Sequence, residues 1–166
     1  SRASVPAYYA DVMRWLPVME DPGKYFSTPC VNEIVSLAEA LRILHAEGLE
    51  ARFARHARIA HAVRAGLEAL DLACFTDASC RANTLSVVRL PEGVADADFR
   101  REVAARGVVV AGGLGPIAGK AFRLGHMGNI GPAEVATTLT AIEGALTALG
   151  RPVKPGAALA AAAAHL

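Results

Sequence analysis

Arg123 is the residue whose setting most directly suggests chemistry. It lies in the otherwise apolar segment 121–124, which we expect to form a strand. An arginine on the buried face of a strand needs an anionic partner, because an unpaired buried charge is costly. A planar guanidinium fits a carboxylate through two parallel hydrogen bonds, so Arg123 is a candidate carboxylate-binding residue. Two alternatives remain open: strand alternation turns Arg123 to water, or an Asp or Glu of the same chain pairs with it.

A group of hydroxyl side chains forms the second candidate site. Tyr25, Ser27 and Thr28 lie on a segment that should be extended, because Pro29 disfavours the helical region for the residue before it. Hydroxyl groups in this arrangement could bind a phosphate. Taken without further context, the same residues favour an ordinary loop.

The segment 112–116, Gly-Gly-Leu-Gly-Pro, is the most unusual local feature of the chain. Three glycines permit positive φ angles and a close approach of the backbone to a ligand. The segment has neither the G-x-x-x-x-G-K-[ST] spacing of a phosphate-binding loop nor a G-x-G-x-x-G opening a helix. By itself it indicates a turn.

Composition and spacing argue against several other classes. The net charge is +1 with both signs mixed along the chain, which disfavours nucleic-acid binding, and the arginines between residues 52 and 64 are expected on a solvated helix face. The cysteines Cys30, Cys74 and Cys80 are odd in number and lack C-x-x-C spacing, which favours a reducing cytoplasm over a disulfide framework or a zinc site. No apolar run reaches the roughly 20 residues that a membrane helix needs, so no membrane partner is expected.

An α+β unit must position these residues. The order of the expected elements after two long helices is β-β-α-β-β-α, which predicts a small antiparallel-type sheet with helices on one face. The expected helices cover 7–16 (closed by Pro17), 31–45, 49–70, 96–107 (with Asp96 as N-cap) and 132–149, and the expected strands cover 72–75, 84–90, 108–110 and 121–125. The Ala-rich tail is either helical by propensity or disordered.

Three stretches together carry a resemblance to a known family: Lys24–Pro29, Gly112–Lys120 and Phe122–Gly128. Their order and spacing, from about residue 8 to residue 150, resemble the C-terminal region of class V (fold-type I) aminotransferases that depend on pyridoxal 5'-phosphate (PLP). The resemblance is greatest to the alanine–glyoxylate and serine–glyoxylate group.

The resemblance implies a role for each candidate site. Arg123 aligns with the arginine that binds the substrate α-carboxylate. Tyr25 and Thr28 align with residues that reach the cofactor phosphate of the neighbouring subunit in a homodimer, and the glycine loop would lie close to the substrate entrance. The implied reaction moves an amino group from an amino acid to a 2-oxo acid such as glyoxylate or pyruvate.

The resemblance also implies that part of the catalytic machinery lies elsewhere. The family needs a lysine that forms a Schiff base with PLP and an aspartate that pairs with the pyridinium nitrogen. Lys24, Lys120 and Lys154 are the chain's only lysines, and none lies in the family's context for that lysine, which is expected upstream of Tyr8. The chain is thus expected to be an inactive C-terminal fragment without a catalytic residue of its own. Residues 1–30 would be a remnant of the large domain and a connecting segment, 31–150 the small domain with its interdomain helix, and 151–166 a tail.

Two alternatives remain. One is another class V PLP enzyme, such as a cysteine-desulfurase-like protein or a 2-aminoethylphosphonate-transaminase-like protein. The Gly-Gly-Leu-Gly-Pro loop favours the glyoxylate group over these, and no cysteine lies in a plausible mobile catalytic loop, Cys80 being the nearest candidate. The other is a free-standing α+β domain used for binding or dimerisation.

Overall fold

The computed structural model describes residues 7–151 and 153–166. The chain divides after Glu47 into two compact units, the second of which runs Gly48–Leu166. The division falls between two long helices, where Gly48 has a φ of 86° that favours glycine. The predicted domain boundaries at residues 30 and 150 stay predictions.

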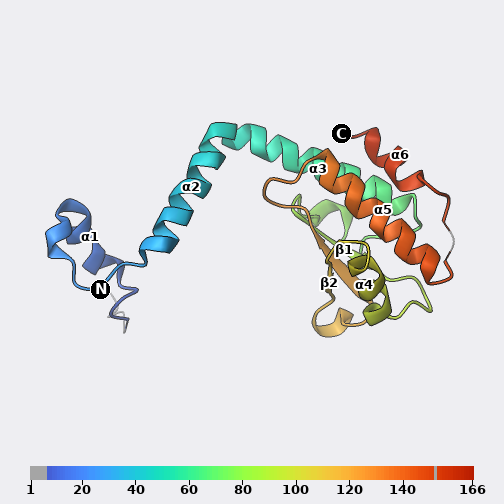
Figure 1. The fold of residues 1–166 in the computed structure, drawn as a ribbon, viewed down its shortest axis with the longest axis horizontal. Helices are drawn as coiled ribbons and strands as arrows, with labels where there is room; N and C mark the ends of the chain where they lie inside the picture. The colour runs from blue at the N-terminus through green and yellow to red at the C-terminus, as the bar shows by residue number, and fades with distance from the viewer. Residues whose placement is uncertain (1–6, 152) are drawn as a thin grey trace. The chain divides into compact units, whose positions relative to one another are not determined.

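The first unit contains helix α1 (Val12–Glu20), the short 3-10 helix η1 (Pro22–Lys24) and helix α2 (Val31–Glu47) (Figure 1). The carboxylate of Asp11 accepts a hydrogen bond from the backbone N–H of Met13 at 3.1 Å and so sets the start of α1. The prediction of a helix over 7–16 closed by Pro17 was wrong. The N-cap lies at Asp11, and α1 continues past Pro17 to Glu20.

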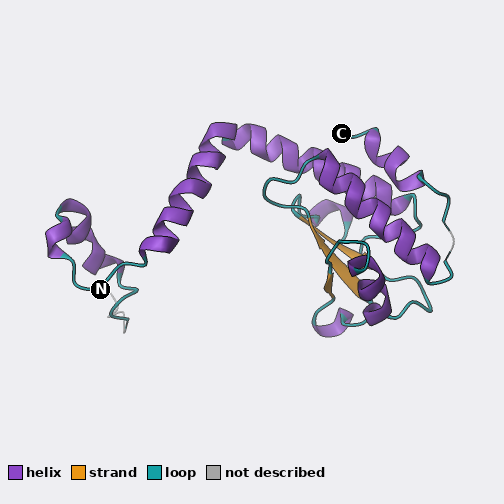
Figure 2. Ribbon diagram, viewed as in Figure 1, coloured by secondary structure: helices purple, strands orange, loops and turns teal. Residues whose placement is uncertain are grey.

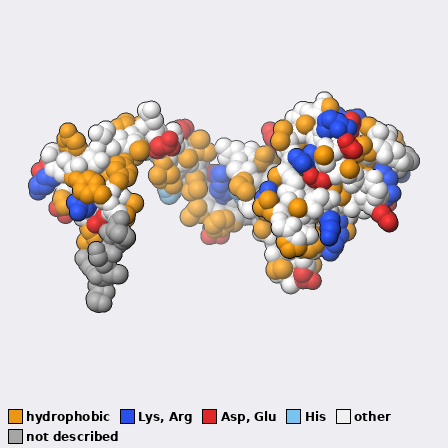
Figure 3. All heavy atoms as spheres, turned by 90° about the horizontal axis from the view of Figure 1, so that it is seen from below, with side chains coloured by type: hydrophobic (Ala, Val, Ile, Leu, Met, Phe, Trp, Pro, Cys, Tyr) orange, Lys and Arg blue, Asp and Glu red, His pale blue; other side chains and the backbone are white. Residues whose placement is uncertain are grey.

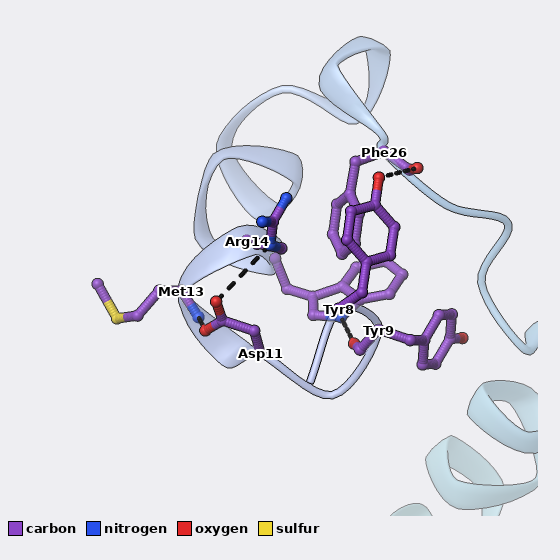
Figure 4. A network of polar contacts seen from close by, with 7 residues as sticks. Tyr8, Tyr9, Asp11, Met13, Arg14 and Phe26 are labelled. Carbon is purple, nitrogen blue, oxygen red and sulfur yellow. Dashed lines mark hydrogen bonds and ion pairs between the residues drawn. The ribbon is translucent and has the colours of Figure 1, made fainter. Parts of the chain in front are cut away.

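An aromatic cluster connects α1 and the residues just before it with the segment after η1 (Figure 4). The ring of Phe26 lies 5.3 Å from that of Tyr8 and 4.7 Å from that of Trp15, measured between centroids, in edge-to-face arrangements. The indole N–H of Trp15 donates to the carbonyl of Tyr9 at 2.7 Å, and the hydroxyl of Tyr8 donates to the carbonyl of Phe26 at 3.4 Å. These contacts fix the path of the chain towards Tyr25 and Thr28.

The helices of the first unit bury none of their residues within this chain. Hydrophobic side chains are visible at the surface in Figure 3. On α2 the exposed hydrophobic residues lie on several sides of the helix; they are Val31, Ile34, Val35, Leu37, Leu41 and Ile43. So much apolar surface is typical of a region that contacts another protein surface.

The second unit is an α+β fold built on a three-stranded antiparallel sheet (Figure 2). Strand β3 (Ala121–Gly125) lies in the centre, with β1 (Leu85–Arg89) on one side and β2 (Ala111–Gly112) on the other. The other elements are α3 (Leu49–Glu68), η2 (Ala78–Cys80), α4 (Asp96–Ala104), η3 (Gly115–Ile117), α5 (Pro132–Ala148) and α6 (Ala157–Ala163). The predicted fold class is confirmed.

Two of the four predicted strands were wrong. The segment 72–75 makes a single bridge between Cys74 and Val88, and the ladder on the other edge of the sheet begins at Ala111 instead of covering 108–110. Val109 is 88% exposed, while Val110 is buried. The β-branched residues 108–110 therefore differ in exposure although they lie outside the ladder.

The core of the second unit lies between helices α3, α4, α5 and α6 and one face of the sheet. Regular spacing brings Ile59, Val63 and Leu67 of α3 onto one face, as expected for a helix that covers a core. Phe122 and Leu124 of β3 project into the same cluster. The Ala-rich part of the tail forms helix α6 (Ala157–Ala163), and Ala158 and Ala162 of this helix are buried in the core.

Gly66 shows how closely the helices pack. A Cβ atom at this position would lie 2.9 Å from Cδ2 of Leu139 on α5 and 3.0 Å from the carbonyl oxygen of Ala158 on α6. Such distances are shorter than van der Waals contact, so α3, α5 and α6 can meet here only around a glycine.

Candidate carboxylate-binding site

Arg123 occupies the middle of the central strand, paired with Val87 of β1 and Ala111 of β2. Its neighbours Phe122 and Leu124 are buried in the core, and strand alternation therefore places the Arg123 side chain on the opposite face of the sheet. The side chain is half-buried. Its Nε–H donates a hydrogen bond of 2.8 Å to the carbonyl of Gly112 on the neighbouring strand.

The Nη1 and Nη2 groups of Arg123 have no hydrogen bond or ion pair with any of the residues that the structure describes. The alternative that an Asp or Glu of this chain pairs with Arg123 is thus not observed within those residues. A guanidinium held through Nε, with two parallel N–H donors left over, can bind a carboxylate in bidentate fashion.

The glycine loop is a tight connection between β2 and β3 that places the Gly112 carbonyl. The N–H of Gly113 donates to the carbonyl of Ala121 at 2.7 Å. A Cβ on Gly113 would lie 2.9 Å from the carbonyl carbon of Ile117 and 3.0 Å from the Ala121 oxygen, so a side chain does not fit. The turn expected from the sequence is confirmed. Its expected closeness to a substrate entrance stays a prediction.

A buried polar pair fixes the end of β3 that follows Arg123. His126 and Ser86 are both almost fully buried, and the Nε2 of His126 lies 2.9 Å from the Oγ of Ser86. The backbone N–H of His126 also donates to the carbonyl of Thr84 at 2.9 Å, which extends the β1–β3 ladder by one bond. Burial, followed by the positive charge of Arg64, lowers the pKa of His126 from 6.5 to about 4. The imidazole is therefore neutral at pH 7.

Two arginines of α3 bind the loop that follows β3. The guanidinium of Arg55 donates to the carbonyls of Ile130 and Gly128 at 2.9 and 3.0 Å, and Arg52 donates to the amide oxygen of Asn129 at 3.3 Å. The prediction that the arginines between residues 52 and 64 form a solvated face was wrong for Arg52, Arg55 and Arg64, which are all half-buried. Sequence periodicity could not reveal this contact, because the partner loop lies more than 70 residues away along the chain.

Tyr25 and Thr28 belong to the first unit and are both exposed. Within the described part of the chain, neither hydroxyl has a hydrogen-bond partner. The end of the segment that carries them is fixed by a hydrogen bond. The hydroxyl of Tyr9 accepts this bond of 3.2 Å from the backbone N–H of Cys30. Both hydroxyl groups are therefore free to donate to an anion.

Other kinds of site lack support in residues 7–151 and 153–166. These residues contain no group of three His, Cys, Asp or Glu side chains that could hold a metal ion. No helix among them is both long enough and apolar enough to cross a membrane. The expectations of no metal and no membrane partner stay predictions for the whole protein.

Comparison with known proteins identifies the family to which the chain belongs. Residues 12–122 match the family described as aminotransferase class-V, which is more than half of the chain. The chain belongs to this family, and its α+β architecture aligns with part of the solved structures of such enzymes.

Individual members of the family are similar to the chain in sequence and in structure. The chain is 40% identical over 148 residues to an uncharacterized aminotransferase of Methanocaldococcus jannaschii, covering 89% of this chain and 38% of that protein. It is 41% identical over 138 residues to the pyridoxamine–pyruvate transaminase of Mesorhizobium japonicum, covering 81% and 35%. It superposes on the crystal structure of ureidoglycine–glyoxylate aminotransferase from Bacillus subtilis with a TM-score of 0.87 and 30% identity, covering 93% and 40%. The chain thus spans about two fifths of the length of these relatives.

Proposed function

We propose that this chain is the C-terminal part of a PLP-dependent aminotransferase that moves an amino group from an amino acid to a 2-oxo acid such as glyoxylate or pyruvate. The observation that carries the proposal is the half-buried guanidinium of Arg123, held through Nε by Gly112 with both Nη groups free. Family membership and the partial coverage of the relatives support it.

In this function Arg123 binds the α-carboxylate that an amino acid and a 2-oxo acid have in common. Its two Nη donors form parallel charge-assisted hydrogen bonds with the two carboxylate oxygens. This contact orients the α-carbon of either substrate in the same way. Correct orientation of this kind contributes on the order of several kcal/mol to lowering a reaction barrier.

The residues present fit one part of a PLP site. Tyr25 and Thr28 would donate their free hydroxyls to the cofactor phosphate, and exposed, unpartnered donors on a fixed segment suit that contact. When bound, PLP supplies the electron sink for reactions at the α-carbon. The lysine that holds the cofactor is expected outside this chain; Lys24 is exposed and lies 3.8 Å from the carboxylate of Asp21. The chain alone is accordingly proposed to be inactive.

The complete protein is proposed to be a homodimer in which Tyr25 and Thr28 contact the cofactor of the neighbouring subunit. The exposed apolar residues of α1 and α2 support this, since no residue of either helix is buried within the chain. The cytoplasmic location predicted from the three cysteines stays a prediction.

The visible absorption spectrum tests the proposal. This chain, and the same chain extended upstream by its reading frame, would each be mixed with PLP and then with an amino acid. We expect only the extended protein to show the absorption band of lysine-bound PLP, and we expect the amino acid to bleach it. If neither protein binds PLP, the proposal fails and the alternative of a free-standing binding or dimerisation domain takes its place.

A further inference from the structure

Gly112 lies between Arg123 and helix α4, and it contacts both. Its carbonyl accepts the Nε–H of Arg123 at 2.8 Å. A Cβ atom on Gly112 would lie 3.2 Å from Oδ2 of Asp96 and 3.5 Å from Nε of Arg100. Gly112 pairs with Phe122 in the sheet, so the missing side chain would point to the helix-covered face, while Arg123 projects from the other face.

Asp96 and Arg100 form an ion pair next to Gly112, on the helix-covered face of the sheet. Nε and Nη2 of Arg100 both donate to Oδ2 of Asp96, at 3.0 and 2.9 Å. The Asp96 side chain is only 16% exposed, and its Oδ1 is buried without a hydrogen-bond partner among the described residues. The predicted N-cap role of Asp96 was wrong, because Ala95 is the N-cap and the carboxylate packs against the strand instead.

We propose that Gly112 and the Asp96–Arg100 pair are positioning residues for the carboxylate site, an inference that rests on the proposed function. The ion pair on α4 packs against Gly112, and the Gly112 carbonyl accepts the Nε–H of Arg123. The substrate carboxylate must then approach the edge formed by Nη1 and Nη2, and cannot use the edge formed by Nε and Nη2. The carbonyl also fixes the plane of the guanidinium, and hence the direction of the α-carbon.

Steady-state kinetics of the complete enzyme test this inference. The variants are Asp96→Ala, Gly112→Ala and the double variant, with Asp98→Ala as the matched control. Asp98 also lies in the first turn of α4 and pairs with Arg101 at 2.6 Å, but both side chains are largely exposed. Asp96→Ala and Gly112→Ala should each raise KM for the amino acid and for the oxo acid about three- to tenfold, and each should also lower kcat, because the α-carbon is then less well oriented.

The double variant separates positioning from general damage. Because the added methyl group of Gly112→Ala acts by displacing the Asp96 carboxylate, it should cost nothing further once that carboxylate is removed. The effects of the two substitutions should therefore be clearly less than additive. An amine substrate without a carboxylate should show the same KM in all variants, and the thermal unfolding temperature should confirm that each variant is folded.

The outcomes for this inference and for the proposed function are distinguishable. If Arg123→Ala raises KM for both carboxylate substrates while Asp96→Ala and Gly112→Ala leave it unchanged, the positioning inference is wrong and the proposed function stands. An equal rise in KM for the carboxylate-free amine would likewise overturn the inference, because the damage would then not be specific to the carboxylate. If Arg123→Ala itself has no effect, both fail.

Discussion

His126 should make the stability of the folded chain depend on pH between about 6.5 and 4. Burial lowers its pKa from 6.5 to about 4 in the folded state, whereas the unfolded chain keeps a pKa near the ordinary value. Between these two values the unfolded state binds a proton that the folded state does not bind. The stability contributed by the neutral imidazole is therefore complete above pH 6.5 and is lost as the pH falls through about 4.

The size of the effect follows from the shift. At about 1.4 kcal/mol per unit of pKa, the free energy of unfolding should fall by about 2 kcal/mol between pH 7.5 and pH 5, and by about 3 kcal/mol once the pH is below 4. Protonation of His126 in the folded state is unfavourable because the side chain is almost fully buried and its Nε2 lies 2.9 Å from the Oγ of Ser86.

Urea unfolding of the 166-residue chain, followed by circular dichroism at several pH values, measures this dependence. His126→Gln is the reference variant, since the glutamine amide can replace the hydrogen bond to Ser86 but does not titrate. Carboxyl groups titrate alike in both proteins, so their contribution cancels in the difference. If the wild-type and His126→Gln curves run parallel from pH 7.5 to pH 5, the reasoning about the buried imidazole is refuted.

Three further predictions concern packing and binding. Gly66→Ala should lower the free energy of unfolding by about 1–3 kcal/mol in urea titrations, because the new methyl group overlaps α5 and α6. In the complete enzyme, Arg123→Ala should lower kcat/KM for the amino acid about 100- to 1000-fold without changing the Kd for PLP measured by fluorescence. Tyr25→Phe and Thr28→Val should each raise that Kd about tenfold, since each removes one hydrogen bond to a charged phosphate, and an unchanged Kd would remove the residue from the proposed site.

Elements with strong periodicity could be predicted from the sequence. The spacing of Val135, Leu139, Ile142 and Leu146 predicted α5, which begins at Pro132 as expected for a residue favoured in the first turn. The strand containing Arg123 was also predicted correctly. In these segments the backbone conformation that the residue types favour is also the one that buries their apolar residues in the core. The sequence pattern therefore predicts the observed structure.

Features that depend on long-range partners could not be predicted. The segment 72–75 has strand-like residues, but the sheet offers it only one bridge, between Cys74 and Val88. The carbonyl of Gly112 accepts from Arg123 because β2 and β3 lie side by side, a relation that no local pattern contains. The pairing of Ser86 with His126, 40 residues apart, has the same origin.

The proposed carboxylate site and the proposed phosphate contacts differ in how many of their supporting residues belong to this chain. Every described contact that orients Arg123 comes from the second unit: the Gly112 carbonyl holds its side chain, and β1 and β2 hold its strand. Among the described residues, the orientation of the Arg123 side chain therefore depends only on residues of Gly48–Leu166. Tyr25 and Thr28, in contrast, present hydroxyl groups whose partner this chain does not supply among its described residues. Substrate orientation should thus be built into the fold of the second unit, whereas cofactor contacts of the first unit should form only when the complete protein assembles.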